Sequence, residues 1–291
     1  MRFEDSISHS LDHRNPGEHP VIVEMQKKAE RILANDAINP KDFIDLYGEE
    51  NVSRDLKRVE SFKSKFEHDD GIKKVSDVLE GLVYQLGELG DWFGKNVETI
   101  RSSEYDDIIN GIDLIAEFNT EDFTKHLALG VDVTFGTLSM GKKFERIKKE
   151  IDSDKLALVK YFESHGFKGA LKHVPRVVIG LEKDTIISLA ALWMRNQNAE
   201  LGNHFAQDIL MREILEQLTA FKKYAESIGA EKAVRSYTQA LAILATAFRE
   251  HNANNTHKER QHMHHEEIIG DRVYQDLRVH LEVFKPASKT T

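Results

Sequence analysis

The sequence predicts an α+β protein, and three observations support this. Residues 73–94 place apolar side chains at the three-and-four spacing of a helix with one buried face. A stretch of β-branched and apolar runs follows, and helical periodicity returns after residue 184. The expected order is helix, two strands, helix, two strands and a helical C-terminal third. The four expected strands cover residues 111–118, 127–136, 156–162 and 174–182, with a glycine-containing loop at 163–173 before the last.

Composition limits the classes of protein to consider. The chain has 291 residues, of which 31% are charged and 40% hydrophobic, as in ordinary globular proteins. The absence of cysteine excludes disulfides, thiolate–zinc sites and a cysteine nucleophile. No apolar run approaches the roughly 18–20 residues of a membrane span, and the polar N-terminus lacks a signal-peptide core. We therefore expect a cytoplasmic protein that does not enter a membrane.

The chain divides into four expected parts. Residues 1–20 are polar and predict a disordered tail, and residues 21–72 indicate short, charged helices. Residues 73–183 form the expected α/β core. Residues 184–291 form a helical region whose apolar helices favour self-association as a homodimer.

The first two expected strands each carry an aspartate in an otherwise apolar run. Aspartate is depleted in strands and costly to bury, so its repeated use needs an explanation. If Phe118 pairs with Leu127 across the hairpin, the antiparallel register sets Asp113 opposite Asp132. Both side chains then point away from the apolar face of the hairpin.

Like charges directly opposite each other on paired strands are unfavourable. Exposure to water relieves this repulsion, and so does a shared divalent cation such as Mg²⁺, which prefers oxygen ligands. The small residues Gly130, Thr134 and Gly136 beside Asp132 suit a concave floor better than an exposed sheet. A metal site is the preferred interpretation, and two solvated aspartates are the alternative.

The order of helix, hairpin with an aspartate on each strand, lysine-rich helix and further strand resembles the PD-(D/E)XK nuclease superfamily. This resemblance covers about residues 73–182 and implies a restriction-endonuclease-like αββαββ core. In that superfamily the two acids hold Mg²⁺, so the resemblance assigns Asp113 and Asp132 as ligands of Mg²⁺ or Mn²⁺. The backbone carbonyl of Val133 is a further ligand by the same resemblance.

The resemblance also implies a lysine and a glutamate. The family lysine that positions the attacking water stands two residues after the second acid, where this chain has Thr134. Some members recruit the lysine from the following helix, which here begins with Lys142 and Lys143. Members often add a glutamate from the first helix, for which Glu80 is preferred over Glu88.

Three other features are candidates for function. Asp107, just before the first expected strand, is either a supplementary metal ligand or part of a solvated turn. Residues 141–183 carry 11 basic and 6 acidic side chains, hence +5 in a chain of net charge −9. This stretch is either a phosphate-facing surface or an ordinary charged helix. In the histidine cluster of the C-terminal region, either His262 and His265 bind zinc or nickel with Glu266, or the histidines are solvent-exposed. They are His257, His262, His264 and His265.

The resemblance implies a Mg²⁺-dependent nuclease, a hydrolase that cleaves the phosphodiester bonds of DNA or RNA. The net charge argues against a general nucleic-acid coat but allows a local basic groove. One alternative is an inactive nuclease-like module that binds or assembles, because the family lysine is displaced. Another is a helical interaction protein in which the hairpin aspartates are incidental.

Overall fold

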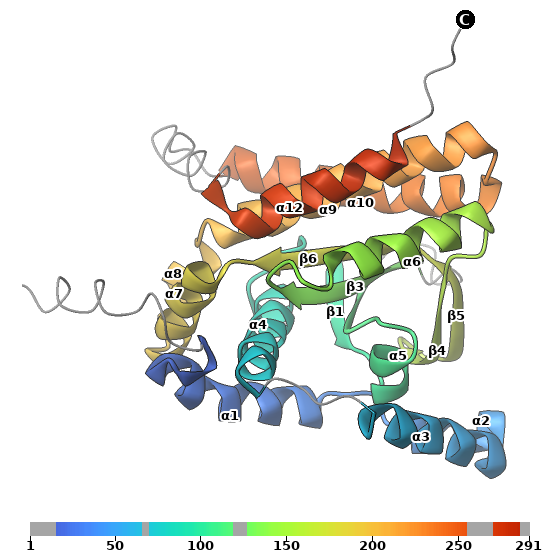
Figure 1. Ribbon diagram of the computed structural model, residues 1–291, viewed down its shortest axis with the longest axis horizontal. Coiled ribbons are helices and arrows are strands. Elements are labelled where there is room, and N and C mark those ends of the chain that lie inside the picture. The colour runs from blue at the N-terminus through green and yellow to red at the C-terminus, as the bar shows by residue number, and fades with distance from the viewer. Residues whose placement is uncertain (1–15, 66–69, 119–126, 255–269, 286–291) are drawn as a thin grey trace, which may run out of the picture.

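A four-stranded mixed sheet lies at the centre of the protein, with helices above and below it in the view of Figure 1. The computed structural model describes residues 16–65, 70–118, 127–254 and 270–285. Across the sheet the strand order is β1-β2-β3-β6. The strands are β1 (Val97–Arg101), β2 (Leu114–Phe118), β3 (Leu127–Phe135) and β6 (Arg176–Leu181).

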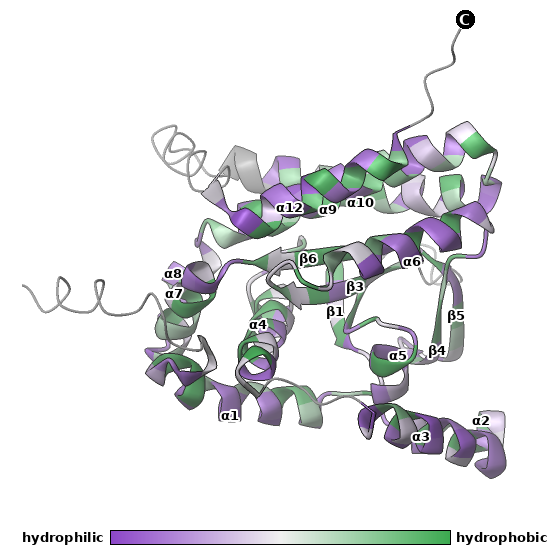
Figure 2. Ribbon diagram, viewed as in Figure 1, coloured by the Kyte–Doolittle hydropathy of each residue, from purple (hydrophilic) through white to green (hydrophobic). Residues whose placement is uncertain are grey.

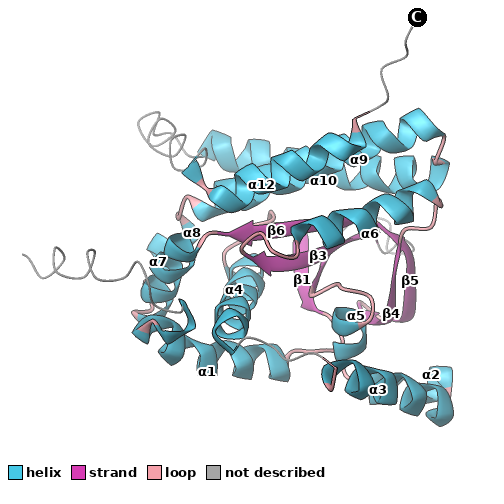
Figure 3. Cartoon of the chain, viewed as in Figure 1, coloured by secondary structure: helices cyan, strands magenta, loops and turns pink. Residues whose placement is uncertain are grey.

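The first three strands are antiparallel, and β6 runs parallel to β3. Phe118 lies opposite Leu127, so the predicted hairpin register is confirmed. The connection from β3 to β6 contains helix α6 (Met140–Asp152) and a separate hairpin, as Figure 3 shows. The strands of that hairpin are β4 (Ala157–Ser164) and β5 (Phe167–Val174).

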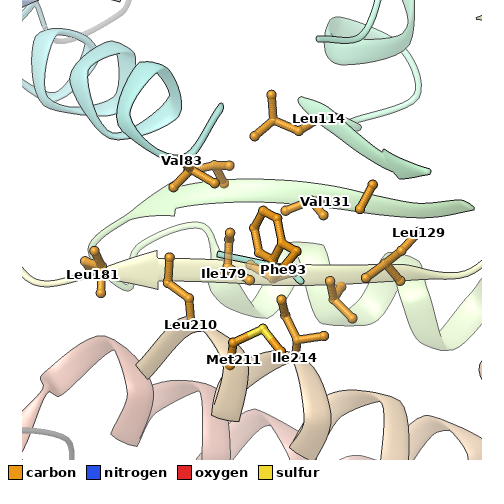
Figure 4. Close-up of a cluster of buried hydrophobic side chains, with 14 of the residues drawn as sticks. Val83, Phe93, Leu114, Leu129, Val131, Ile179, Leu181, Leu210, Met211 and Ile214 are labelled. Atoms are coloured by element: carbon orange, nitrogen blue, oxygen red, sulfur yellow. The ribbon is translucent and has the colours of Figure 1, made fainter. Parts of the chain in front are cut away.

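The main core lies where helices cover the sheet. Helix α4 (Asp70–Leu89) packs against β1 and β3 with the apolar face that its sequence predicts. Helices α6, α9 (Ala206–Ile228) and α12 (Arg272–Leu281) pack against β6. Figure 4 shows Val83 of α4, Val131 of β3 and Ile214 of α9 within one cluster of buried apolar side chains. Helices thus pack against both the β1–β3 part of the sheet and β6, and this packing positions the strand ends that carry polar residues.

The remaining helices surround this centre. The N-terminal region contains η1 (Pro16–Glu18), α1 (Pro20–Asn35), η2 (Pro40–Phe43), α2 (Ile44–Tyr47) and α3 (Glu49–Lys63). A short helix, α5 (Glu104–Ile108), joins β1 to β2. The C-terminal region contains α7 (Lys183–Met194), α8 (Asn198–Gly202), α10 (Glu231–Asn254) and η3 (Glu282–Phe284), besides α9 and α12. Figure 2 shows α3 as largely hydrophilic, in contrast to the apolar central strands.

The protein is therefore α+β, but two strands were not predicted. Strand β1 escapes notice because its sequence, VETIR, carries two charged side chains and no clear apolar stripe. The expected loop at 163–173 instead contains the end of β4 and most of β5. Its tight turn consists of His165 and Gly166, both with positive φ (46° and 79°). Asn-Gly is the usual sequence for such a turn, so His-Gly gives a weak signal.

The predicted N-terminal tail ends earlier than expected. Residues 16–18 form η1, and α1 begins at Pro20, whose fixed φ suits the first position of a helix. Residues 1–15 of the predicted tail lie outside the described residues.

Candidate functional site

The two aspartates predicted to face each other lie in one buried cluster. Asp113 immediately precedes β2, and its N–H donates to the carbonyl of Val131 at 3.0 Å, beyond the last register pair of the hairpin, Leu114 with Val131. The Oδ2 atom of Asp113 accepts a 2.6 Å hydrogen bond from the N–H of Val133. Asp132 precedes that residue in β3, and the two aspartates are each only 7% exposed. The hairpin therefore brings both acids together beside the Val133 peptide.

Helix α6 adds a lysine to these acids. The Nζ atom of Lys143 lies 2.5 Å from Oδ1 of Asp132 and donates to the carbonyl of Val133 at 3.2 Å. Lys142 is exposed on the helix surface. Successive residues of an α-helix are rotated by about 100°, so only one of two adjacent lysines can face the sheet. Of the two lysines predicted from the sequence, Lys143 belongs to the site and Lys142 lies outside it.

Arg101, at the end of β1, connects the aspartates to two further acids. Its Nη2 atom lies 2.8 Å from Oδ2 of Asp107 and 3.5 Å from Oε2 of Glu80. Its Nη1 atom donates to the carbonyl of Asp113 at 2.6 Å. Glu88, the other glutamate considered on α4, instead accepts from the N–H of Thr99 away from the site.

Six side chains thus make up what we call the acid cluster. They are Glu80, Arg101, Asp107, Asp113, Asp132 and Lys143. Four carboxylates and two cations leave a formal charge of −2 when all are ionised, which one divalent cation would balance. The oxygen donors of Asp113, Asp132 and Val133 are those that Mg²⁺ prefers, so the residues present fit this ion.

The charges in the acid cluster shift the protonation of its members. Burial, and then the neighbouring acids with Glu80 foremost, raise the pKa of Asp113 well above its usual value. Burial raises the pKa of Glu80 to about 8 despite the opposing charge of Arg101. Burial lowers the pKa of Lys143, but the carboxylates of Asp132 and Asp113 outweigh this and the pKa rises. Without an added cation the cluster therefore retains protons near neutral pH, and a bound divalent ion would displace them.

A buried arginine holds the segment that leads into Asp113. Arg176 of β6 donates to the carbonyl of Gly111 at 2.9 Å and pairs with Glu150 at 3.0 Å. Arg146 donates to the carbonyl of Ile109 at 3.0 Å. Gly111 has φ +60°, and a Cβ at this position would lie 2.6 Å from Nη1 of Arg146. The positive φ therefore favours glycine at this turn, and a larger residue would also displace the end of the Arg146 side chain.

Asp106 shows how an acid next to the site differs from one within it. It is fully buried, and Lys160, Tyr161, Ser103 and Asn110 all donate hydrogen bonds to its carboxylate. Its oxygens are fully used in joining α5 to β4, so its role is structural. Asp107 points instead to Arg101.

Arg101 was not among the predicted site residues. Its strand was not predicted, and an arginine in a short run of β-branched residues carries no motif. The one available clue was the uncompensated negative charge of the two predicted aspartates. Buried carboxylates usually have a cationic partner, so a lysine or arginine from elsewhere in the chain was to be expected.

The other predicted features have mixed outcomes. At least six of the eleven basic side chains in residues 141–183 form ion pairs within the protein, so much of their charge is already balanced. They are Lys143, Arg146, Lys148, Lys160, Lys168 and Arg176. The histidine cluster at residues 257–265 lies outside the described residues.

Neither the search for membrane-spanning helices nor the comparisons with known proteins assigns a function to the chain. Among the described residues, no helix is long and apolar enough to cross a membrane. No protein-family model, curated protein or solved structure matches the chain.

Proposed function

We propose that the protein is a Mg²⁺-dependent nuclease of the PD-(D/E)XK type, which hydrolyses phosphodiester bonds in nucleic acid. The observation that carries this proposal is the meeting of Asp113, Asp132 and Lys143 around the peptide of Val133. Two acids, a backbone carbonyl and an ammonium group come from three separate elements to one place. A structural ion pair would need only one acid and one cation.

The order of the elements supports the same proposal at the level of the fold. Helix α4 carries Glu80, the β2–β3 hairpin carries the aspartates, and α6 carries the lysine before β6 returns parallel to β3. We infer a restriction-endonuclease-like core made of α4, β1–β3, α6 and β6. This core differs from the expected αββαββ order in two ways. Strand β1 precedes the β2–β3 hairpin in the sheet, and β4 pairs with β5 in a separate sheet.

The lysine bears on the choice between an active and an inactive protein. The inactive alternative rests on Thr134, which stands where the family has its lysine. Lys143 brings an ammonium group to Asp132 from the following helix, as in members that recruit the lysine there. This contact favours catalysis over the inactive alternative.

The residues of the acid cluster divide the expected chemistry among them. Asp113, Asp132 and the carbonyl of Val133 would hold Mg²⁺, which when bound polarises the phosphate and lowers the pKa of a bound water. Lys143, with its raised pKa, stays charged at neutral pH and would stabilise the negative charge that develops on the phosphate. Arg101 orients Glu80 and Asp107 and offsets their charge.

A cleavage assay tests the proposal. Labelled single- and double-stranded DNA and RNA are incubated with the protein and Mg²⁺ or Mn²⁺, alongside Asp132→Ala. We expect cleavage by the wild type that requires the metal and is lost in the variant. Activity that persists in Asp132→Ala would belong to another site or to a contaminant and would contradict the proposal.

Calorimetry with the same metals separates the alternatives. Metal binding that depends on Asp132 without any cleavage would identify an inactive nuclease-like module. If neither binding nor cleavage occurs, a helical interaction protein is the remaining interpretation.

A further inference from the structure

A second group of metal-ligating side chains lies at the other end of strands β1 and β2. Glu98 and Glu117 are direct partners in the β1–β2 register, so two carboxylates stand opposite each other on neighbouring strands. His165, in the turn of the β4–β5 hairpin, reaches them from a separate sheet. Three segments that are distant in sequence thus contribute to one place.

The distances suit a shared ion. The Nε2 atom of His165 lies 2.7 Å from Oε2 of Glu98 and 4.0 Å from Oε2 of Glu117. One ligand atom from each of the three residues can be chosen so that all lie within 4.8 Å of one another. Ligands of a tetrahedral zinc ion stand roughly 3.4 Å apart at the usual bond lengths. Small side-chain rotations are enough to close the group around an ion.

The three residues differ in how far they are buried. Glu117 is 2% exposed, whereas the side chains of Glu98 and His165 are 38% and 45% exposed. A buried carboxylate anchors the group from the sheet, and the open side gives an ion and its water ligands access.

The identity of residue 165 is a separate observation. Its backbone is left-handed, a conformation in which asparagine is favoured over histidine in a two-residue hairpin turn. Histidine here gives up some turn preference and supplies an imidazole directed at two carboxylates. This choice is explained if the imidazole is a ligand.

We propose that Glu98, Glu117 and His165 bind a divalent transition-metal ion that fastens the β4–β5 hairpin to the central sheet. One imidazole and two carboxylates suit zinc and similar ions, whereas Mg²⁺ rarely uses a nitrogen ligand. Along β2 this site is four residues from Asp113, or about 13 Å at the rise of a strand. That separation is too great for two ions to share one phosphate, which requires about 4 Å. The ion is therefore structural, and its binding is independent of the proposed nuclease activity.

Calorimetric titration with Zn²⁺, in excess Mg²⁺ to occupy the acid cluster, tests this site in the full chain. Glu98→Gln removes a ligand charge, and His165→Asn removes the imidazole while keeping a residue that suits the turn. Glu163→Gln is the matched control, because Glu163 is an exposed carboxylate on the same hairpin that pairs with Lys168. The chain has further histidines at 257–265 that offer imidazole ligands to Zn²⁺, so the site is defined by the component of binding that the variants lose.

We expect one Zn²⁺ component that weakens at least tenfold in Glu98→Gln and in His165→Asn and is unchanged in Glu163→Gln. Co²⁺ should give an absorption band that the same two variants lose. We also expect Zn²⁺ to raise the Tm of the wild type by more than that of either variant. Equal Zn²⁺ binding by the wild type and His165→Asn would reduce the group to an ion pair and overturn the proposal.

Discussion

The two ends of strands β1 and β2 gather acids in different ways. At one end, Asp113 and its neighbours are paired with two resident cations, Arg101 and Lys143. At the other end, Glu98 and Glu117 are register partners on neighbouring strands, and the imidazole of His165 lies 2.7 Å from Glu98 and 4.0 Å from Glu117. The first end is buried and already held in place by ion pairs, whereas the second is partly open.

This difference shows what each end needs from a cation. In the acid cluster the resident cations reduce the formal charge to −2, so the proposed divalent ion would enter a site whose side chains are already in place. At the second end an ion would bridge side chains from three segments that already lie close together. Substitutions that remove a cation or an acid are therefore expected to have different effects on stability and on metal binding at the two ends.

The largest expected effect follows from removing Arg101. Its side chain is 10% exposed, and its loss leaves the partly buried carboxyl groups of Glu80 and Asp107, 16% and 29% exposed, without their cationic partner. Removing one member of a buried pair typically costs about 3–5 kcal/mol. We expect Arg101→Gln to lower the free energy of unfolding by this amount in chemical denaturation without added metal.

Arg101→Gln also tests how the formal charge of the acid cluster affects its response to Mg²⁺. With Arg101 absent the cluster has a formal charge of −3, so Mg²⁺ should raise the Tm of Arg101→Gln by more than that of the wild type. Arg54→Gln is the control, since Arg54 pairs with Glu50 on an exposed helix surface. An equal response to Mg²⁺ in Arg101→Gln and the wild type would show that Arg101 does not share the site with the metal.

The two adjacent lysines of α6 provide the next test. We expect Lys143→Met to reduce cleavage by about 10²–10³-fold, the usual cost of losing one group that stabilises transition-state charge. Lys142→Met should leave the rate within a few-fold of the wild type, because Lys142 is exposed and outside the cluster. Rates are measured under single-turnover conditions with saturating Mg²⁺. Equal losses in both variants would assign the effect to general phosphate attraction instead.

A smaller effect concerns a buried acid that lacks a cation. Glu213 of α9 accepts from the N–H of Gly180, and among the described residues no ion pair reaches it. Burial raises the pKa of Glu213 well above its ordinary value of 4.5. The folded state therefore binds this proton more tightly, and stability is lost as pH rises from about 4.5 through the folded-state pKa.

Glu213→Gln should remove that part of the pH dependence. The amide keeps an oxygen that accepts from the N–H of Gly180 but carries no titrating proton. As pH rises through this range, the free energy of unfolding of the variant should therefore increase relative to that of the wild type by up to about 1.4 kcal/mol per pH unit. Denaturation at several pH values measures the difference, and the acid cluster contributes equally to both proteins. A difference that does not change with pH would refute a raised pKa at Glu213.

Part of this site could be predicted from sequence because the signal was local. The alternation along residues 127–135 and the short distance to Phe118 fixed the hairpin register, and with it the positions of Asp113 and Asp132. The helical spacing of apolar residues likewise located α4. In each case the pattern lies within about 20 residues and follows from the period of a strand or a helix.

The remainder depends on contacts between distant segments. Arg101 and Lys143 reach the aspartates from β1 and α6, and no spacing rule says which of two adjacent lysines faces the sheet. Strand β5 was missed because the turn that leads into it uses His165, where asparagine is the usual residue. Histidine at this position made the turn hard to predict, and the same histidine supplies the imidazole of the proposed metal site.

A crystal structure with Mn²⁺, located by its anomalous scattering, tests the central claim most directly. The account predicts one ion bound by the carboxylates of Asp113 and Asp132 and the carbonyl of Val133. It also predicts that this density is absent from the Asp132→Asn variant prepared in the same way. Anomalous density missing from the acid cluster of the wild type, at Mn²⁺ concentrations that support cleavage, would contradict the claim.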